Sequence, residues 1–504
     1  MNRTLFTNAD VFIPEGRFVR GSLLVEQGTI MSVLPAGENT TNAEIVDLHG
    51  GNLLPGFVDA HVHLLELALR ELQCDLSGAR SADDAVERLA RWAREHENDR
   101  PVMGVDWDES TWNERTMPTR AMLDAIDPHR PIFARRVCLH VGVANSALLN
   151  MLSASRQFVD ADTGRVTEAA AAEATRRLDP PPAEIPATIE SAIGRLHSLG
   201  VTAVHDIVDV NALSPYLEGV RRSKVPLRID ALFITGPESF AHVRESCAGL
   251  DPELFRPLGI KLFSDGSLSG RTAALHSCYA DAHTIGEFLL DEDEFRGTLR
   301  RCVAEGITCA VHGIGDRAIR VVAMAMGLFP GEQDLFRIEH AELTGWEEVD
   351  LLRRVGVPLV LQPNFVRNWQ QEGGLYESRL GRARARKCNR FRTLREAGVS
   401  YAFGSDGMPP GPLFGMRGAT HHPVSSERLT LSQALLAYAA GGRMGRRPRA
   451  LGEIAPGRPA DLVVLSGDPG SGDPDSLAVE RTYLGGRLVY QRKAPAPAGE
   501  SHLF

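Results

Sequence analysis

The sequence contains no apolar run long enough to cross a membrane, and its cysteines show no pairing pattern. No stretch of about 18 apolar residues occurs, so no transmembrane helix is predicted. The first ten residues lack the apolar segment of a signal peptide, so we expect a cytoplasmic protein. The seven cysteines are scattered and include no C-x-x-C pair. This pattern is typical of reduced thiols and argues against disulfides or a cysteine zinc site.

An excess of positive charge is also missing. The chain carries 55 Lys and Arg residues against 65 Asp and Glu residues, a net charge of −10 at pH 7. This balance argues against a general affinity for nucleic acid or for an anionic membrane surface. We therefore expect no nucleic-acid partner and no membrane partner.

The long middle of the chain alternates short β-branched runs with amphipathic helical segments. Helices are predicted, for example, at 188–199, 291–305, 316–328 and 346–355. This alternation is the pattern of a parallel sheet. Eight such units predict an α/β protein with a (β/α)8 TIM barrel. The eight candidate strands are 54–63, 202–206, 225–235, 258–263, 307–312, 335–340, 357–362 and 400–405.

Both ends of the chain are rich in short alternating strands separated by turns. We therefore predict that the termini pair into one small β-sandwich domain, made of residues 1–53 plus 444–492. The barrel then spans residues 54–443. It carries an insertion at about 64–200, between its first and second strands, which contains a predicted helix at 82–97 and a tryptophan-rich loop.

Residues that can bind metals or exchange protons stand at or near the carboxyl ends of five of the eight predicted strands, where barrel active sites are built. They are His61 and His63 in the first strand, Lys261 in the fourth, His312 and His340 at the ends of the fifth and sixth, and Asp406 after the eighth. Each alone has another interpretation, such as a hydrogen-bonded structural histidine or a helix N-cap for Asp406. Their convergence at one end of the barrel favours a metal site.

Lys261 strengthens this interpretation because it lies inside an apolar strand, between Ile260 and Leu262. Burying an ammonium group without a partner is strongly unfavourable. The lysine should therefore lose its charge, pair with an acid or be chemically modified.

These residues lie in motifs that resemble the amidohydrolase superfamily, most closely its amidohydrolase-3 branch, which includes N-substituted formamide deformylases. The resemblance covers nearly the whole chain. The motifs are PGFVDAHVH at 55–63, IKLFSDGSLSGRTAAL at 260–275, HGIGD at 312–316, RIEHA at 337–341, GSDG at 404–407 and APGRPADLVVL at 455–465.

The resemblance implies that His61 and His63 bind one metal ion and that His312 and His340 bind a second. Lys261, carboxylated by CO2, would bridge the two ions. Asp406 would complete the first site and act as general base. Such nitrogen and oxygen donors suit Zn²⁺, with Fe²⁺, Mn²⁺ or Co²⁺ as alternatives. A single-metal site with a plain lysine stays open, and similar enzymes are often homodimers.

The implied function is that of a metal-dependent amidohydrolase. It would hydrolyse a non-peptide C–N bond (an amide, N-formyl or N-acyl bond) of a small molecule through a metal-activated hydroxide. One alternative is a deaminase or cyclic-amide hydrolase of the same superfamily; another is a non-catalytic binding protein on the same barrel. Lys261 favours a two-metal hydrolase, since mononuclear deaminases of this superfamily usually lack it.

Substrate contacts are predicted outside the metal ligands. Asp265, Arg271 and His283 follow the fourth strand and should face the mouth of the barrel, while Trp107 lies in the tryptophan-rich loop of the insertion. A structural salt bridge is the alternative for Arg271, and buried packing is the alternative for Trp107. His205 and Asp206 end the second strand and are candidate partners for a metal-binding histidine, since such histidines often donate to a nearby carboxylate.

Overall fold

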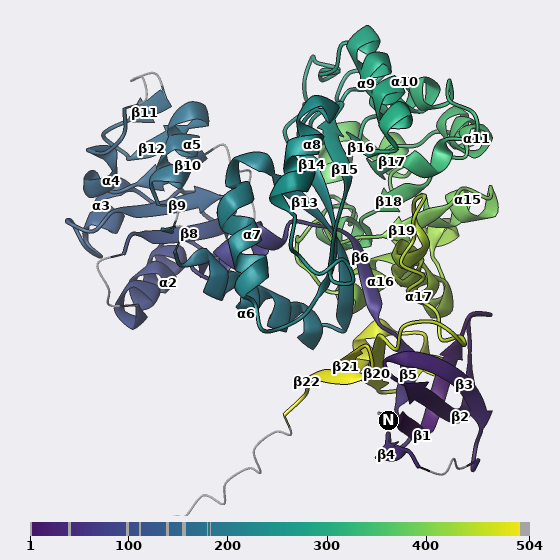
Figure 1. The fold of residues 1–504 in the computed structure, drawn as a ribbon. Coiled ribbons are helices and arrows are strands. Elements are labelled where there is room, and N and C mark those ends of the chain that lie inside the picture. Colours follow the sequence, from purple (N-terminus) through teal and green to yellow (C-terminus); the bar gives the residue numbers. More distant parts are fainter. Residues whose placement is uncertain are drawn as a thin grey trace, which may run out of the picture. The chain divides into compact units, whose positions relative to one another are not determined.

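The computed structural model describes residues 3–38, 42–96, 100–109, 112–137, 141–153, 158–178, 180–181 and 183–493 (Figure 1). The chain divides into two compact units. The first comprises Met1–Leu64, Ile193–Leu217 and Ser223–Phe504, and the second comprises Leu65–Ala192 and Glu218–Arg222. One of the seven cysteines, Cys138, lies outside the described residues, as do His140 and the last residue of the helix predicted at 82–97.

The first unit contains an eight-stranded parallel sheet whose strands neighbour one another in sequence order. All eight predicted barrel strands are confirmed. They are β6 (Phe57–Val62), β13 (Val201–Asp209), β14 (Arg228–Ile234), β15 (Phe255–Phe263), β16 (Thr308–Gly313), β17 (Phe336–His340), β18 (Leu359–Leu361) and β19 (Tyr401–Phe403). The sheet is nearly closed, because the Asp406 backbone N–H, just after β19, donates to the His61 carbonyl of β6 at 2.7 Å. The (β/α)8 barrel is therefore confirmed.

Helices connect these strands, as a right-handed parallel barrel requires. Helix α9 shows how the sequence sets their ends: Asp291 caps its first turn by accepting from Asp293 and Glu294 backbone N–H groups, and left-handed Gly306 ends it. The helices are α1 (Leu64–Arg70), α6 (Ile185–Ser198), α7 (Leu213–Arg222), α8 (Pro237–Ser246), α9 (Glu292–Glu305), α10 (Asp316–Met326), α11 (Trp346–Val355), α12 (Pro363–Trp369), α13 (Leu375–Leu380), α14 (Arg382–Ala385), α15 (Phe391–Glu396), α16 (Pro412–Thr420) and α17 (Leu431–Ala440).

The two ends of the chain share one mixed sheet, in which the purple N-terminal strands lie beside the yellow C-terminal ones (Figure 1). In its hydrogen bonding, the predicted sandwich is one continuous eight-stranded sheet joined where β5 pairs with β20. A core that includes Phe6, Leu53 and Tyr483 stabilises it. Its strands are β1 (Arg3–Ile13), β2 (Arg17–Glu26), β3 (Thr29–Pro35), β4 (Glu44–Asp47), β5 (Asn52–Pro55), β20 (Leu462–Ser466), β21 (Ala478–Leu484) and β22 (Arg487–Gln491).

The second unit overlaps the insertion predicted at about 64–200. It has its own six-stranded sheet and its own hydrophobic clusters, one of which contains Trp107 and Trp112. Its elements are β7 (Cys74–Asp75), β8 (Val102–Trp107), β9 (Ile132–Arg136), β10 (Val141–Ala144), β11 (Val159–Asp160), β12 (Arg165–Thr167), α2 (Ala82–Glu95), α3 (Arg120–Asp124), α4 (Ser146–Leu149) and α5 (Glu168–Arg177). In the described part of the chain, no helix combines the length and the apolar character that crossing a bilayer requires.

Gly404 allows the last barrel strand to approach the first. A Cβ atom at this position would lie 2.5 Å from the His61 backbone nitrogen and 2.7 Å from the His61 Cβ. Real Cβ contacts are never this short, so any larger residue would push β19 and β6 apart. The closure of the barrel and the position of His61 therefore depend on the same glycine.

We expect the Gly404→Ala variant to lose about 1–3 kcal/mol of unfolding free energy, because overpacking at a rigid backbone displaces its neighbours. It should also bind metal more weakly, since His61 is the residue displaced. Denaturant unfolding and metal titration measure the two effects. The control is Gly297→Ala in α9, where a Cβ would meet nothing within 4 Å. A Gly404→Ala protein as stable as this control would contradict the account.

Candidate metal centre

The carboxyl end of the barrel gathers the six predicted metal ligands. They come from β6 and the residue after it (His61, His63), β15 (Lys261), β16 (His312), β17 (His340) and the loop that follows β19 (Asp406). Neighbouring parallel strands place their last residues side by side: Phe263 pairs with His312, and Gly313 pairs with His340. The fold thus brings together residues that are up to 345 positions apart in sequence.

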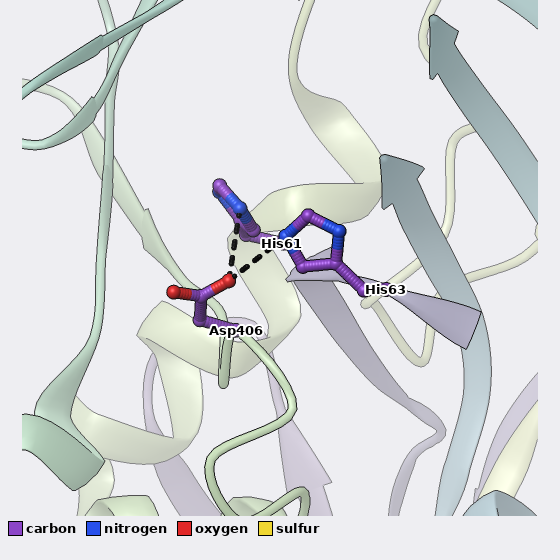
Figure 2. Close-up of side chains that lie close together, drawn as sticks. All are labelled: His61, His63 and Asp406. Carbon is purple, nitrogen blue, oxygen red and sulfur yellow. Dashed lines mark ion pairs between the residues drawn. The ribbon is translucent and has the colours of Figure 1, made fainter. Parts of the chain in front are cut away.

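His61, His63 and Asp406 form the tightest part of this centre (Figure 2). The Asp406 Oδ1 atom lies 3.1 Å from His63 Nε2 and 3.3 Å from His61 Nε2. One potential ligand atom from each of the three residues lies within 4.8 Å of the others. The His61 side chain is 1% exposed, whereas those of His63 and Asp406 are 19% and 18% exposed. His63 and Asp406 are therefore the members that a substrate can reach.

The proton of His61 is fixed by Glu339, which is fully buried beside it. The Glu339 carboxylate accepts from His61 Nδ1 at 2.6 Å. In the neutral imidazole, Nδ1 then carries the proton and Nε2 carries the lone pair. That lone pair faces the Asp406 carboxylate, so two electron-rich atoms point at each other. A shared cation between them, either a proton or a metal ion, resolves this arrangement, so the three residues suit a metal ion.

In His312 and His340, too, a hydrogen bond occupies one of the two ring nitrogens. The His312 Nε2 atom donates to the Gly266 carbonyl at 3.0 Å, and His340 Nδ1 bonds to Gln362 Oε1 at 2.9 Å. Each ring therefore keeps its other nitrogen as a lone-pair donor. The His340 ring centroid lies 4.5 Å from that of His312 and 5.0 Å from that of His61. A partner on the second nitrogen is the usual condition of a metal-binding histidine.

Burial keeps these bases uncharged. It lowers the pKa of His312 to about 3, helped by the nearby charge of Lys261, and it lowers the pKa of His340 well below its ordinary value. Burial also lowers the pKa of Lys261 to about 8, although Glu339 and Asp406 oppose the shift. The Lys261 amine therefore loses its proton at a lower pH than an exposed lysine does. The neutral amine is the form that can react with CO2.

Asp406 remains ionised. Burial alone would raise the pKa of its carboxyl group, but the charges and hydrogen bonds of His61 and His63 outweigh this and lower the pKa well below its usual range. The backbone at Asp406 is left-handed, with φ of 54°, and so are His340 and Ala341, with φ of 71° and 44°. Such strain in non-glycine residues clusters at functional sites. Histidine nitrogens, a carboxylate and a lysine amine that can form a carbamate together fit a divalent metal.

Two residues that orient these ligands, Glu339 and Gln362, were not predicted from the sequence. Both are buried and bond directly to a metal-site histidine. Glu339 also pairs with Arg337, whose guanidinium donates to His205 Nδ1 at 2.6 Å. The link predicted for His205 is thus present but indirect. The sequence does contain a sign of Glu339: it lies two residues after Arg337 in an apolar strand, so both charges are on the same face.

The residues predicted to contact substrate differ in their burial and in their bonding partners. Asp265 is buried and accepts backbone N–H groups from Ala274, Ile314 and Gly315, which ties the loop after β15 to the start of α10. Burial raises the pKa of Asp265 to about 7 in spite of these bonds. Arg271 forms the salt bridge considered as its alternative, at 2.8 Å from Asp281.

His283 is exposed. Trp107 has no exposed surface and packs against Trp112 inside the second unit, which is the buried packing considered as its alternative. Phe263 was not predicted, yet its ring lies 4.3 Å from Lys261 Nζ and 5.5 Å from the His312 ring, and it is 37% exposed. It is an apolar surface next to the metal ligands.

Comparison with known proteins agrees with this geometry. A family profile described as "Amidohydrolase family" matches residues 44–490. The chain belongs to the amidohydrolase family. This amidohydrolase is a hydrolase of C–N bonds, as the family name describes, and the match supports the resemblance to the amidohydrolase-3 branch.

Three similar proteins span almost the whole amidohydrolase chain. YtcJ of Bacillus subtilis (strain 168) is 29% identical over 94% of this chain and 96% of its own. The N-substituted formamide deformylase of Arthrobacter pascens is 25% identical over 98% and 99%. The crystal structure of an uncharacterized metal-dependent hydrolase from Pyrococcus furiosus is 29% identical, with a TM-score of 0.77 over 93% of this chain and 99% of its own.

We expect the Gln362→Leu variant to bind metal about 10–100-fold more weakly, because His340 loses the acceptor that orients its ring. Equilibrium metal titration of purified protein measures the change. Gln362→Glu keeps an acceptor at the same place and should retain most of the affinity. An unchanged affinity in Gln362→Leu, with thermal unfolding of the metal-free protein also unchanged, would show that this hydrogen bond has no positioning role.

Proposed function

We propose that this amidohydrolase hydrolyses a non-peptide amide bond of a small molecule, with N-formyl and N-acyl amines as the substrate class. The observation that carries the proposal is the pairing of the ionised, partly exposed Asp406 with the Nε2 atoms of His61 and His63. A relative that matches 98% of the chain is named as an N-substituted formamide deformylase. A small acyl group also suits a centre flanked by the Phe263 ring.

The chain's own residues supply proton transfer. When bound, a divalent metal ion contributes Lewis-acid polarisation of the carbonyl group and lowers the pKa of water. Asp406 accepts the proton of the attacking water, and a new C–O bond forms at the carbonyl carbon. The C–N bond then breaks, and Asp406 returns the proton to the leaving nitrogen. The products are a carboxylic acid and an amine.

The other residues of the centre orient the metal-binding side chains or could bind metal themselves. Glu339 keeps the His61 Nε2 lone pair on the site side by binding Nδ1. Lys261, once carboxylated by CO2, would present anionic oxygens in place of a buried ammonium group. Those oxygens would be metal ligands, so Lys261 could hold metal ions together with His61, His63, His312 and His340.

We propose Zn²⁺ as the metal, since neutral imidazole and carboxylate donors match its preferences. We further propose a cytoplasmic location and a homodimer. The six cysteines in the described part of the chain are free thiols, which suits a reducing compartment. Sedimentation of the purified protein would decide the oligomeric state.

We expect Asp406→Asn to lower kcat by about 10²–10⁴-fold, because the amide cannot accept the water proton. The readout is acid release from N-formyl and N-acyl amines, with metal content measured on the same sample. Asp162→Asn, at an exposed position of the second unit, controls for the loss of one carboxylate. Near-normal turnover in Asp406→Asn would remove its role as general base.

Release of ammonia from amino-substituted rings, with no acid from any N-acyl amine, would replace the proposed reaction by deamination. The two outcomes are distinguished by assaying both products on one preparation.

A further inference from the structure

A second cavity, of about 420 Å³, lies at the end of the barrel where the strands begin. Its wall includes Pro257 and Leu258 of β15, Thr308 at the start of β16 and Phe336 at the start of β17. The metal ligands stand at the other ends of the same strands, so this cavity is distinct from the metal centre. Its volume lies in the range of small-molecule pockets and far exceeds the roughly 30 Å³ that one water molecule occupies.

Guanidinium groups dominate the polar part of this wall. Arg256 shares Asp230 with Arg449, which leaves one positive charge, and Arg446 lies between Glu332 and Asp334, which leaves one negative charge. Arg244 and Arg447 also line the cavity, and no ion-pair partner is recorded for either among the described residues. The cavity therefore carries uncompensated positive charge.

The rest of the wall is apolar, with Phe240, Leu258, Leu335, Phe336 and Pro358 among its members. An inorganic anion would leave these side chains facing water. A ligand that has an anionic group at one end and an apolar body satisfies both parts of the wall. Arginine favours planar carboxylates because its two N–H groups can bind both oxygens.

The cavity also reaches a chain of buried hydrogen bonds that ends at the metal centre. His205 and Arg337 line it, with 4% of each side chain exposed. Arg337 pairs with Glu339, and Glu339 accepts from His61 Nδ1 at 2.6 Å. The Arg337 guanidinium is already bonded to Glu339, His205 and the Ala60 carbonyl, so an anion held by Arg244 and Arg447 acts on this chain through its charge. It therefore makes the environment of His61 more negative, which favours a bound cation.

We propose that this cavity binds a small organic carboxylate with an aromatic or aliphatic body, and that its binding stabilises the metal at His61 through Arg337 and Glu339. Binding at this site does not depend on the hydrolytic reaction proposed above. It is measured without a substrate, so the two proposals can fail separately.

The probe is benzoate, titrated into the metal-loaded protein by calorimetry. The test variant is Arg244→Ala/Arg447→Ala, which removes the two arginines that have no recorded ion pair. The control is Arg487→Ala, an exposed arginine of β22. We expect saturable binding to the wild type and to the control, and at least about tenfold weaker binding to the double variant, since hydrogen bonds to charged groups are lost.

Three results would overturn the site. If the wild-type protein shows no saturable binding of benzoate, the proposed site does not exist. Equal affinity in the double variant would place benzoate elsewhere, for instance at the metal centre. Competition by inorganic phosphate with an affinity equal to that of benzoate would replace the organic carboxylate by a simple anion, because the apolar wall would then contribute nothing. Weaker binding of uncharged benzyl alcohol supports the carboxylate requirement.

The link to the metal centre is tested by the rate at which a chelator withdraws the metal. Saturating benzoate should slow this rate by about fivefold in the wild type and in Arg487→Ala, the lower range of measured couplings between sites. The double variant should show no change. An unchanged rate in the wild type at saturation, or the same slowing in the double variant, would overturn the coupling.

Discussion

The need to partner ionisable groups inside the barrel is the constraint on which the structure depends. Barrel interiors are usually filled by branched apolar side chains, yet here Lys261, Arg337 and Glu339 are all buried among the strands. Isolated charges at such depth would cost several kcal/mol each. Glu339 meets this constraint by binding both Arg337 and His61, so one carboxylate joins the barrel interior to the metal centre.

Strand β17 carries both the buried ion pair of Arg337 and Glu339 and the metal-site residue His340. Its alternation turns Arg337 and Glu339 to the same face, and the left-handed backbone of His340 then interrupts the alternation. His340 can therefore lie beside His312 even though a regular strand would turn it away from the face of Glu339. Backbone strain at this residue is offset by the hydrogen bond to Gln362 and by the packing around it.

Much of the barrel and of the metal centre could be predicted from the sequence, because strand periodicity and the position of ionisable residues at strand ends are local properties. The eight barrel strands followed from them, and the structure gathers His61, His63 and Asp406 as expected. The partners Glu339 and Gln362 could not be predicted, since pairing across strands depends on the register of the folded sheet. The packing of Trp107 depends in the same way on a sheet that sequence periodicity did not reveal.

We propose that side chains from four barrel strands, with the residues that follow β6 and β19, would hold two metal ions, with Lys261 between them. Elemental mass spectrometry of protein purified without chelators or an affinity-metal column tests it most directly. The account predicts about two equivalents of divalent transition metal per chain, because two sets of nitrogen and oxygen donors flank a lysine that can carry a carbamate. One equivalent would contradict the bridged centre. None, with no uptake of added zinc in the presence of bicarbonate, would contradict the metal centre itself.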